Sequence, residues 1–431
     1  MRILMLAQFY PPTIGGEERH VRNLSLALAA RGHAVSVATL WHQGESEREM
    51  DQGVRIHRIR GTMQRATVLF SEKGRRFAPP FPDLETMRAL RRIIKQERPD
   101  IVHAHNWIVH SFTPIKSWSK AKLVVTLHDY SLLCVQKRLM YQNNVCAGPA
   151  LTKCLRCATD FYGAAKGPLA TLANWTWGKA ERQSVDMFLP VSQAVAEGTR
   201  MAAYRVPHRV IPNFVPDNVS LLRHDDDALL AQLPRGDFLL FVGDVRRDKG
   251  VEVLLRAYAR TGSQVPLVLI GRLGSDISPD FPPHVMALQG WPHEAVMSAW
   301  GRCTIALAPS IWPDPCPTVA MEAMAMGRPV IASRIGGLSD IVADGETGIL
   351  VPPGNVEALS EAIQTLLADP ARRNRMGMAA KQRVVEFEAR TVVPRIEQVY
   401  RELLHSQPPQ VEEAGNTYIY AETPMHIHRK A

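Results

Sequence analysis

The chain has 431 residues, of which 46% are hydrophobic and 22% are charged. This composition excludes an intrinsically disordered protein, and the length favours two domains over one. No apolar run approaches the roughly 18 residues that a membrane helix needs. The N-terminal residues form a short apolar stretch without a small-residue cleavage site, which indicates a first strand rather than an export signal. We therefore expect a cytoplasmic protein.

The net charge of +9 is unevenly distributed, because residues 1–210 carry +14 whereas residues 211–431 carry −5. A basic half suggests an anionic partner, which is a membrane surface, a phosphorylated substrate or a nucleic acid, and a surface that is merely solvated is the equal alternative. Only 7% of the residues are aromatic, and none of them forms a run interleaved with basic residues, so a nucleic acid is not expected.

Residues 55–76 are the candidate for contact with an anionic membrane, and a solvated loop is the alternative. In this segment basic and apolar residues alternate: Arg55, Arg58, Arg60, Arg65, Lys73, Arg75 and Arg76 with Ile56, Ile59, Met63, Val68, Leu69 and Phe70.

The first half of the chain alternates short apolar runs with helical patterns, which predicts parallel α/β layers. The helix expected at residues 17–31 places Val21, Leu24 and Leu28 on one face, as a helix packed on a sheet requires. The strands expected in this half are residues 2–9, 33–40, 100–105, 123–128 and 186–191.

A second α/β series begins near residue 237. Its expected strands are residues 238–242, 266–271, 304–308, 329–333 and 348–351. The sequence thus predicts two Rossmann-like, doubly wound domains that face each other across a cleft. The expected units are residues 1–212, a linker at 213–236, a second domain at 237–388, a helix at 389–405 that crosses back, and a disordered tail at 406–431.

The most specific segment is a Pro-rich loop that leads into a helix, whose first residue is expected to be Pro317. The amides of Thr318 and Val319 would then be free to bind phosphate. Asp314 lies on the loop and Glu322 about one turn into the helix, so the two acids could bind hydroxyl groups of a nucleotide sugar. The alternative is that both acids are solvated, but Glu322 stands among apolar residues, where a buried acid needs a partner.

A second segment places Lys249 where a strand end runs into a helix. A lysine there can neutralise the charge that develops on a departing diphosphate. Arg246 or Arg247 could add a second cation, and we favour Arg246; a solvated basic turn is the alternative.

Glycines and histidines mark the N-terminal half. Gly15 and Gly16 precede a helix and would allow a substrate or phosphate to approach the backbone. His128 ends a strand, where open α/β sheets bind ligands, although a buried core histidine is the alternative. His103 and His105 face the same side of another strand, and without a third ligand they are interpreted as cleft or packing residues rather than a metal site.

Together these segments resemble the retaining glycosyltransferases of family four, which have the GT-B fold. Two acids eight positions apart, a Glu-Ala-Met-Ala helix and a Gly-Gly loop carry the resemblance, at Asp314, Glu322 and Gly336–Gly337. It covers roughly residues 1–400. It implies that Asp314, where the family usually has glutamate, contacts the transferred sugar, that Glu322 binds the ribose, and that His128 lies beside the reacting sugar.

The resemblance also extends to Lys249, which matches a family lysine. Asp244, however, stands where the family has an arginine, so Arg246 would have to supply that charge. Ser192 and Asn213 match family positions without a clear role.

Four cysteines are gathered in one polar loop, and four thiolates suit tetrahedral zinc. A structural zinc is therefore expected there, with free thiols as the alternative, at Cys134, Cys146, Cys154 and Cys157. No other cofactor is expected, because the Asp-rich run at 225–227 lies in the linker rather than at a strand end.

The sequence therefore predicts a metal-independent, retaining glycosyltransferase that uses a nucleotide diphosphate sugar and a glycan, lipid-linked or other acceptor. We hypothesise that it binds peripherally at the inner membrane face. A nucleotide-sugar epimerase of the same fold and a zinc-bearing nucleic-acid-binding module are the alternatives. The expected catalytic residues are His128, Lys249 and Asp314. The expected donor-binding residues are Gly15, Gly16, Arg246, Lys249, Asp314, Pro317, Thr318, Val319 and Glu322.

Overall fold

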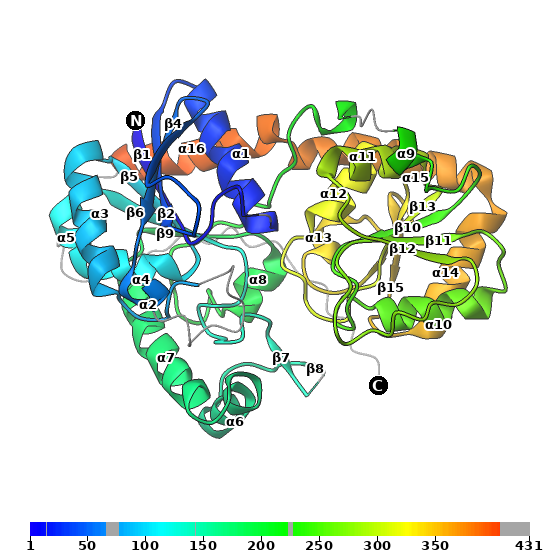
Figure 1. Ribbon diagram of the computed structural model, residues 1–431, viewed down its shortest axis with the longest axis horizontal. Helices are drawn as coiled ribbons and strands as arrows, with labels where there is room; N and C mark the ends of the chain where they lie inside the picture. Colours follow the sequence, from blue (N-terminus) through cyan, green and yellow to red (C-terminus); the bar gives the residue numbers. More distant parts are fainter. Residues whose placement is uncertain (14, 66–76, 143, 223–226, 406–431) are drawn as a thin grey trace, which may run out of the picture.

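The computed structural model describes residues 1–13, 15–65, 77–142, 144–222 and 227–405. The tail expected to be disordered, most of the linker's acidic run and residues 66–76 of the candidate membrane segment lie outside the described residues. Within the described chain, two α/β domains lie side by side, each built on its own sheet (Figure 1).

The N-terminal sheet has seven strands in the order β3-β4-β2-β1-β5-β6-β9, and all neighbours are parallel except β3 and β4. In chain order the strands are β1 (Arg2–Ala7), β2 (Ala34–Leu40), β3 (Arg48–Asp51), β4 (Val54–Ile59), β5 (Ile101–His105), β6 (Lys122–Leu127) and β9 (Met187–Pro190). The central strand β1 pairs with β2 on one side and with β5 on the other, and its apolar side chains are buried. The sheet therefore changes direction between β1 and β5, which is where a doubly wound sheet binds ligands.

Helices cover this sheet on both sides. They are α1 (Gly16–Ala30), α2 (Thr62–Arg65), α3 (Leu84–Glu97), α4 (Val109–Phe112), α5 (Lys116–Ser119), α6 (Leu151–Tyr162), α7 (Lys166–Ser184) and α8 (Gln193–Gly198), with 3-10 turns η2 (Asn106–Ile108) and η3 (Thr113–Ile115). The pair α6 and α7 projects from the domain together with a small hairpin, β7 (Met140–Tyr141) and β8 (Asn144–Val145) (Figure 1).

The C-terminal sheet has six parallel strands in the order β12-β11-β10-β13-β14-β15. They are β10 (Leu239–Val242), β11 (Leu267–Ile270), β12 (Val285–Leu288), β13 (Ile305–Ala308), β14 (Val330–Ser333) and β15 (Gly348–Val351). Most are continuous apolar runs, as expected of a parallel sheet with both faces covered. The sheet changes direction between β10 and β13.

The covering helices of this domain are α10 (Val251–Thr261), α11 (His293–Arg302), α12 (Thr318–Ala325), α13 (Leu338–Ile341), α14 (Val356–Ala368) and α15 (Pro370–Arg383). The linker contributes η4 (Val219–Leu221) and α9 (Asp227–Leu230), and η5 (Val384–Phe387) follows α15.

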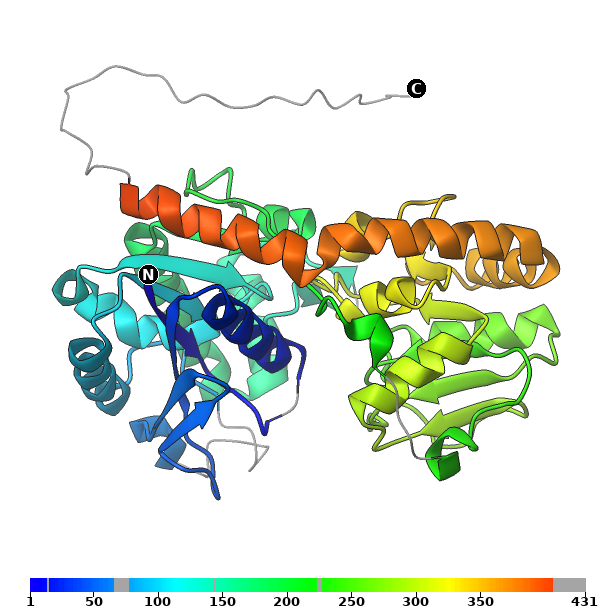
Figure 2. The ribbon, with the colours of Figure 1, turned by 90° about the horizontal axis from the view of Figure 1, so that it is seen from above.

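The last helix, α16 (Ala389–His405), returns from the C-terminal domain and lies along the N-terminal one (Figure 2). Its apolar residues Ile396, Val399 and Tyr400 are buried in the same core as Val21 and Leu24 of α1. Because both α1 and α16 bury their apolar faces there, α16 is part of the N-terminal domain in packing although it is last in sequence.

The two segments that connect the domains lie side by side. The amide of Val215 donates to the carbonyl of Phe387 (2.9 Å), and the amide of Ala389 donates to the carbonyl of Val215 (3.0 Å). The amide of Arg390 also donates to Asp217 (2.9 Å). The two connecting segments are thus joined to each other by hydrogen bonds between residues 215–217 and 387–390.

Among the helices of the described residues, none has both the length and the apolar character that crossing a membrane requires.

Candidate active site

Helix α12 begins at Thr318, one residue later than predicted. Pro317 is the N-cap residue, because its ψ of 110° is extended rather than helical. No side chain caps the helix start, and the neighbouring amides of Thr318 and Val319 are not tied up by a cap. The predicted anion site at this helix start is therefore shifted by one residue and keeps its donors.

Asp314 lies on the loop before α12 and is buried. At Gly336 a Cβ atom would lie 2.3 Å from the Asp314 carbonyl oxygen, and at Gly337 it would lie 2.2 Å from the carbonyl oxygen of Pro315. The amide of Gly337 donates to the Asp314 carbonyl (2.8 Å). Only glycine allows the two loops to pack this closely, so the Gly-Gly pair holds the Asp314 loop in place.

Lys249 and Asp314 form an ion pair. The Lys249 ammonium also lies 5.2 Å from the centre of the Trp312 ring. Lys249 follows β10 and Asp314 follows β13, and these strands are neighbours where the C-terminal sheet changes direction. The structure thus brings together the predicted lysine and the predicted aspartate at the expected edge of the sheet.

Glu322 is buried in α12 and has two basic neighbours. Its Oε1 atom lies 3.0 Å from Nε2 of His293 and 3.8 Å from a guanidinium nitrogen of Arg19. Burial alone would raise the pKa of Glu322, but the hydrogen bond and charge of His293, with the charge of Arg19, hold this pKa below its ordinary value. Since Arg19 belongs to α1, Glu322 lies at the interface between the domains. No motif or spacing indicated His293, a lone histidine at the start of α11.

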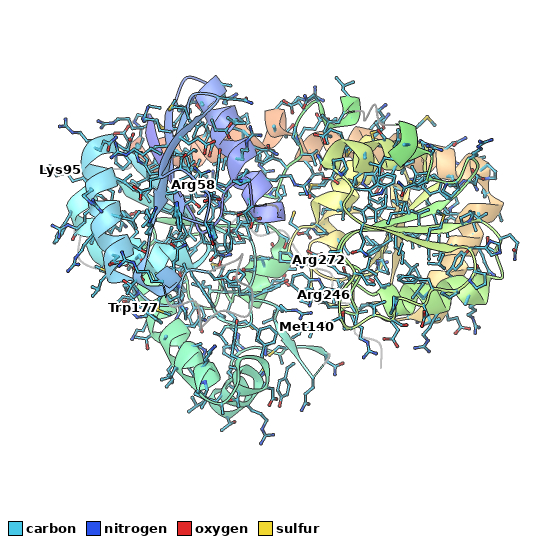
Figure 3. All side chains as sticks on the ribbon, viewed as in Figure 1. Arg58, Lys95, Met140, Trp177, Arg246 and Arg272 are labelled. Atoms are coloured by element: carbon cyan, nitrogen blue, oxygen red, sulfur yellow. The ribbon has the colours of Figure 1, made fainter. Side chains whose placement is uncertain are left out.

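The predicted second cation, Arg246, lies 3.3 Å from the carboxylate of Asp248. Arg138 of the N-terminal domain pairs with the same carboxylate. Asp244, at the position where the family has arginine, lies 3.3 Å from Arg272. Figure 3 shows Arg246 and Arg272 on the side of the C-terminal domain that faces the N-terminal domain. Arg138 was missed because it is distant in sequence from the residues it meets.

His128 follows β6 and belongs to a cluster of histidines. Its Nε2 atom lies 2.9 Å from Nδ1 of His105, and its ring centre lies 4.8 Å from that of His20. Burial lowers the pKa of His128 to about 4, although the charge of Asp129 opposes this shift. The imidazole is therefore neutral near pH 7, so it can exchange hydrogen bonds but does not carry a charge.

His103 is fully buried and joins α16 to the N-terminal sheet. Its Nδ1 atom lies 2.6 Å from the hydroxyl of Tyr400, and its Nε2 atom lies 2.7 Å from the hydroxyl of Thr126. Burial lowers the pKa of His103 to about 3. This histidine packs the core, as one of the two sequence interpretations proposed.

A polar cluster that the sequence did not indicate lies beside His128, after the carboxyl ends of β5 and β6. The side-chain amide of Asn106 donates to the carboxylates of Glu17 (2.8 Å) and Asp129 (3.2 Å). The ammonium of Lys137 lies 4.0 Å from the Asp129 carboxylate. Burial, followed by the charge of Glu18, raises the pKa of Glu17 to about 8. The one available signal was position, since Asn106 and Asp129 each follow a predicted strand.

Gly15 and Gly16 lie at the start of α1, with Gly15 as the N-cap residue in extended backbone. A Cβ atom at Gly16 would meet no protein atom within 4 Å. A side chain at position 16 would therefore clash with no described residue, so packing does not require a glycine at this position.

Two further family positions have local roles. Ser192 caps α8, because its hydroxyl accepts a hydrogen bond from the amide of Val195 (3.2 Å). Asn213 donates to the carbonyl of Cys316 (3.1 Å) and so ties the linker to the loop before α12.

The four cysteines of the polar loop line one small cavity of about 30 Å³. Burial, with the charges of the other three thiolates, raises the pKa of Cys157 to about 11. None of the four is in a disulfide. Across the described ranges, no group of three or more His, Cys, Asp or Glu side chains is arranged to hold a metal ion.

The candidate membrane segment is partly a strand. Its first residues form β4, which the sequence analysis did not predict, and Arg58 is buried beneath Glu45 and Glu49. Arg55 pairs with Glu97. The expectation of membrane contact is therefore wrong for Ile56, Arg58 and Ile59, because β4 buries them, whereas the Arg55 side chain stays 43% exposed.

The two doubly wound domains meet where their central strands end, as in the enzymes of GT-B architecture. Sucrose-phosphate synthase from Thermosynechococcus elongatus has a similar structure, with a TM-score of 0.70 and 23% identity over 93% of this chain and 98% of that one. The catalytic domain of starch synthase IV from Arabidopsis thaliana, bound to ADP and acarbose, gives 0.66 and 16% over 94% and 99%. The GT-B fold predicted from the sequence is confirmed.

Two family profiles together match most of the chain. The profile described as Glycosyltransferase Family 4 matches residues 14–219, and the profile described as Glycosyl transferases group 1 matches residues 230–383. The chain belongs to the group 1 glycosyltransferases, and the resemblance found in its sequence is confirmed.

Relatives of similar length carry several names. Glycogen synthase from Mycobacterium tuberculosis is 28% identical over 436 aligned residues, which cover 93% of this chain and 94% of that one. D-inositol 3-phosphate glycosyltransferase from Arthrobacter sp. is 27% identical over 403 residues, which cover 85% of each chain.

Proposed function

We propose that this glycosyltransferase moves a sugar from a nucleotide diphosphate sugar with retention of the anomeric configuration and without a metal ion. The observation that carries the proposal is the ion pair of Lys249 and Asp314 on the loop that leads to the uncapped amides of Thr318 and Val319. Anabaena HepE in complex with UDP-glucose, similar at a TM-score of 0.63 and 17% identity over 93% of this chain and 99% of that one, supports this class of donor.

Positive charge at the domain interface supports the metal-independent part of the proposal. A leaving diphosphate develops negative charge, which fixed cations and helix amides stabilise without reorganising. Lys249 lies at this interface, and Arg138 and Arg246 share the carboxylate of Asp248 nearby. We infer that the leaving group draws Lys249 away from Asp314, which frees this carboxylate to accept hydrogen bonds from sugar hydroxyls.

The remaining roles follow from burial and charge. Glu322 is ionised and buried, so it is suited to accept hydrogen bonds from ribose hydroxyls. His128 is neutral and lies on the N-terminal side of the interface, where it can hydrogen-bond to the reacting sugar.

Product analysis tests the proposal directly. Turnover is measured in the presence of EDTA with a nucleotide sugar chosen by its protection of the chain against thermal unfolding. NMR of the anomeric proton then compares donor and product. Retention with EDTA present is expected, whereas inversion or a loss of activity restored by a divalent cation would overturn the assignment.

We infer that the acceptor is a glycan, a lipid-linked saccharide or another anionic molecule that binds to the N-terminal domain. The charge of +14 on residues 1–210 supports an anionic acceptor and reversible attachment to the inner face of a membrane. Names among the relatives, such as glycogen synthase and D-inositol 3-phosphate glycosyltransferase, include both a polysaccharide and a phosphorylated compound. Activity assays with these two acceptor classes separate the alternatives.

Zinc at Cys134, Cys146, Cys154 and Cys157 stays a prediction, supported by the one cavity that the four thiols share. Elemental analysis of the purified chain should find about one zinc ion. Cys154→Ser should lower the zinc content, whereas Cys303→Ser, outside the cluster, should leave it unchanged. A metal-free chain with four titrating thiols would contradict the prediction.

A further inference from the structure

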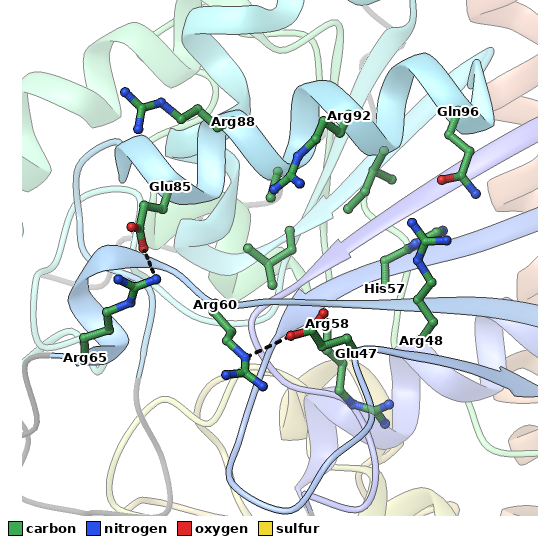
Figure 4. Close-up of a pocket in the computed structure, with 13 residues that line it drawn as sticks. Glu47, Arg48, His57, Arg58, Arg60, Arg65, Glu85, Arg88, Arg92 and Gln96 are labelled. Carbon is green, nitrogen blue, oxygen red and sulfur yellow. Dashed lines mark ion pairs between the residues drawn. The ribbon is translucent and has the colours of Figure 1, made fainter.

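A cavity of about 400 Å³ lies in the N-terminal domain between α3 and the β3–β4 hairpin. Figure 4 shows Arg88, Arg92 and Gln96 on the wall formed by α3, and Arg48, Arg60 and Arg65 on the opposite wall. Its volume falls within the roughly 300–1,000 Å³ of small-ligand sites. None of its lining residues belongs to the proposed donor site.

The cavity is strongly basic, because six arginines and only two glutamates line it. Each of the two glutamates forms an ion pair with one of these arginines, Glu47 with Arg60 (3.1 Å) and Glu85 with Arg65 (3.3 Å).

Three of the arginines have no such partner within the described ranges. Among the described residues, Arg48, Arg88 and Arg92 have neither a carboxylate nor a hydrogen-bond acceptor. Arg88 and Arg92 also lie one turn apart on one helix, where like charges repel. An anion in the cavity would relieve this repulsion.

The walls of the cavity are fastened at one end by Asp83. This residue caps α3 by accepting a hydrogen bond from the amide of Thr86 (2.8 Å), and it also accepts from the amides of Thr62 (3.1 Å) and Met63 (3.0 Å) of α2. These bonds keep the pKa of Asp83 low although burial opposes the shift.

Glu97 fastens the other end. It accepts hydrogen bonds from Arg55 and lies 3.0 Å from Nε2 of His57, and both partners belong to β4. Because both ends of α3 are tied to the opposite wall, the arginines surround a space of fixed size.

The floor of the cavity reaches toward the proposed acceptor side. Arg58, which lines the cavity and is buried, donates to the carbonyl of Pro11 (3.0 Å) in the loop that leads from β1 to Gly15 and Gly16. Arg60 directly follows the carboxyl end of β4, and His128 follows the carboxyl end of β6 in the same parallel sheet.

We propose that this cavity binds the phosphate or diphosphate group of the acceptor. Guanidinium groups match phosphoryl oxygens in geometry and keep their charge at every physiological pH. The assignment to the acceptor rests on the proposed function, whereas the binding of a phosphoryl group does not. A lipid-borne diphosphate and a soluble sugar phosphate present the same chemistry to these arginines.

Calorimetric titration of the full chain with inorganic pyrophosphate tests the site. Lys249→Ala removes one cation of the proposed donor site and so lowers its contribution to the binding. Because Arg246 and the amides of Thr318 and Val319 remain in this background, only the part of the binding that depends on Arg88 and Arg92 reports on the cavity, and Arg88→Ala with Arg92→Ala should weaken that part about tenfold or more. Arg91→Ala is the matched control, because Arg91 lies on the same helix but stacks on Trp118 in another cavity.

The control should change the affinity less than about twofold, since it removes one charge from the same helix outside the cavity. Equal weakening by Arg91→Ala and by the double variant, or no effect of the double variant, would overturn the proposal. A chain in which Lys249→Ala keeps full turnover would instead contradict the proposed function and leave the cavity result standing.

Co-sedimentation with vesicles distinguishes the two sources of the phosphoryl group. The probes are phosphatidylcholine vesicles with and without phosphatidic acid. Binding that needs phosphatidic acid and is lost in the double variant identifies a lipid-borne group. Pyrophosphate binding without vesicle binding identifies a soluble one, and loss of the arginine dependence in both measurements rejects the site.

Discussion

The two domains carry their chemistry in different ways. In the C-terminal domain the two buried acids, Asp314 and Glu322, come from one continuous segment, and each has a basic side chain beside it, Lys249 or His293. In the N-terminal domain the polar groups near His128 come from separate elements that only the fold brings together. The comparison teaches that the proposed donor side is encoded locally, whereas the proposed acceptor side depends on topology.

The largest effect should come from the donor side. Lys249→Ala should lower kcat by about 10²–10³-fold, because the departing diphosphate loses a fixed positive charge. Steady-state kinetics at saturating donor measure this effect. Lys381→Ala, an exposed lysine on α15 of the same domain, is the control and should keep wild-type kinetics. A folded Lys249→Ala variant with unchanged kcat would place the leaving group elsewhere.

Glu322→Ala should weaken donor binding by about 1–3 kcal/mol, since a buried hydrogen-bonded acceptor is removed. Titration with the donor nucleotide measures the change. Glu322→Gln keeps the shape and one acceptor oxygen, so it should lose less affinity than the alanine variant. If both variants bind the donor nucleotide as tightly as the wild type does, donor binding does not depend on Glu322. The inference that the donor side is encoded in the segment of Asp314 and Glu322 would then be contradicted.

The N-terminal histidines should make stability depend on pH. The pKa of His103 is about 3 in the folded chain and about 6.5 when unfolded. Below pH 6.5 the unfolded chain binds a proton that the folded chain does not, so stability is lost as the pH falls toward 3. Between pH 7 and pH 5 this single residue should cost about 2 kcal/mol.

The wild type and His103→Gln should therefore differ less in their free energy of unfolding at pH 5 than at pH 7, by about 2 kcal/mol. Chemical unfolding of both chains at the two pH values measures this difference. Comparing two chains at the same pH cancels the contributions of the other titrating groups, including His20, His105, His128 and Glu17. His208→Gln, an exposed position, is the control. A constant gap for His103→Gln would show that this histidine is not held neutral by burial.

The smallest effect should come from the contact that joins the two regions. Arg138→Ala removes a partly exposed ion pair between the domains and one cation near Asp248, so activity should fall about three- to tenfold. Kinetics at low and at high ionic strength measure it, because screening should narrow the difference between the variant and the wild type. A difference that grows with salt would contradict an electrostatic role for Arg138.

The sequence predicted five of the six strands of the C-terminal domain, and β15 has the predicted bounds of Gly348–Val351, whereas the edge strand β12 (Val285–Leu288) was not predicted. Long apolar runs between turns leave little choice of register there. The helix start at Pro317 was misplaced by one residue, because a proline fits both the N-cap and the first turn.

The N-terminal domain was harder to predict. Strand β4 was missed because its basic residues, Arg55 and Arg58, suggested a surface segment, whereas in the fold they are neutralised by Glu97, Glu45 and Glu49. Arg138, His293 and the Glu17 cluster could not be found from spacing, since their partners are distant in sequence. The predicted roles of the site residues and the zinc site stay predictions that the experiments above test.

Helix α16 has a consequence for how parts of this enzyme can be exchanged. The N-terminal domain includes a segment from the far end of the chain, held through Glu397 to Arg31 and through Tyr400 to His103. A chimera that takes residues 1–212 from one relative and the remainder from another would therefore join a core to a helix that did not evolve with it. An exchange of acceptor preference between relatives should succeed only when residues 389–405 are taken from the same relative as residues 1–212.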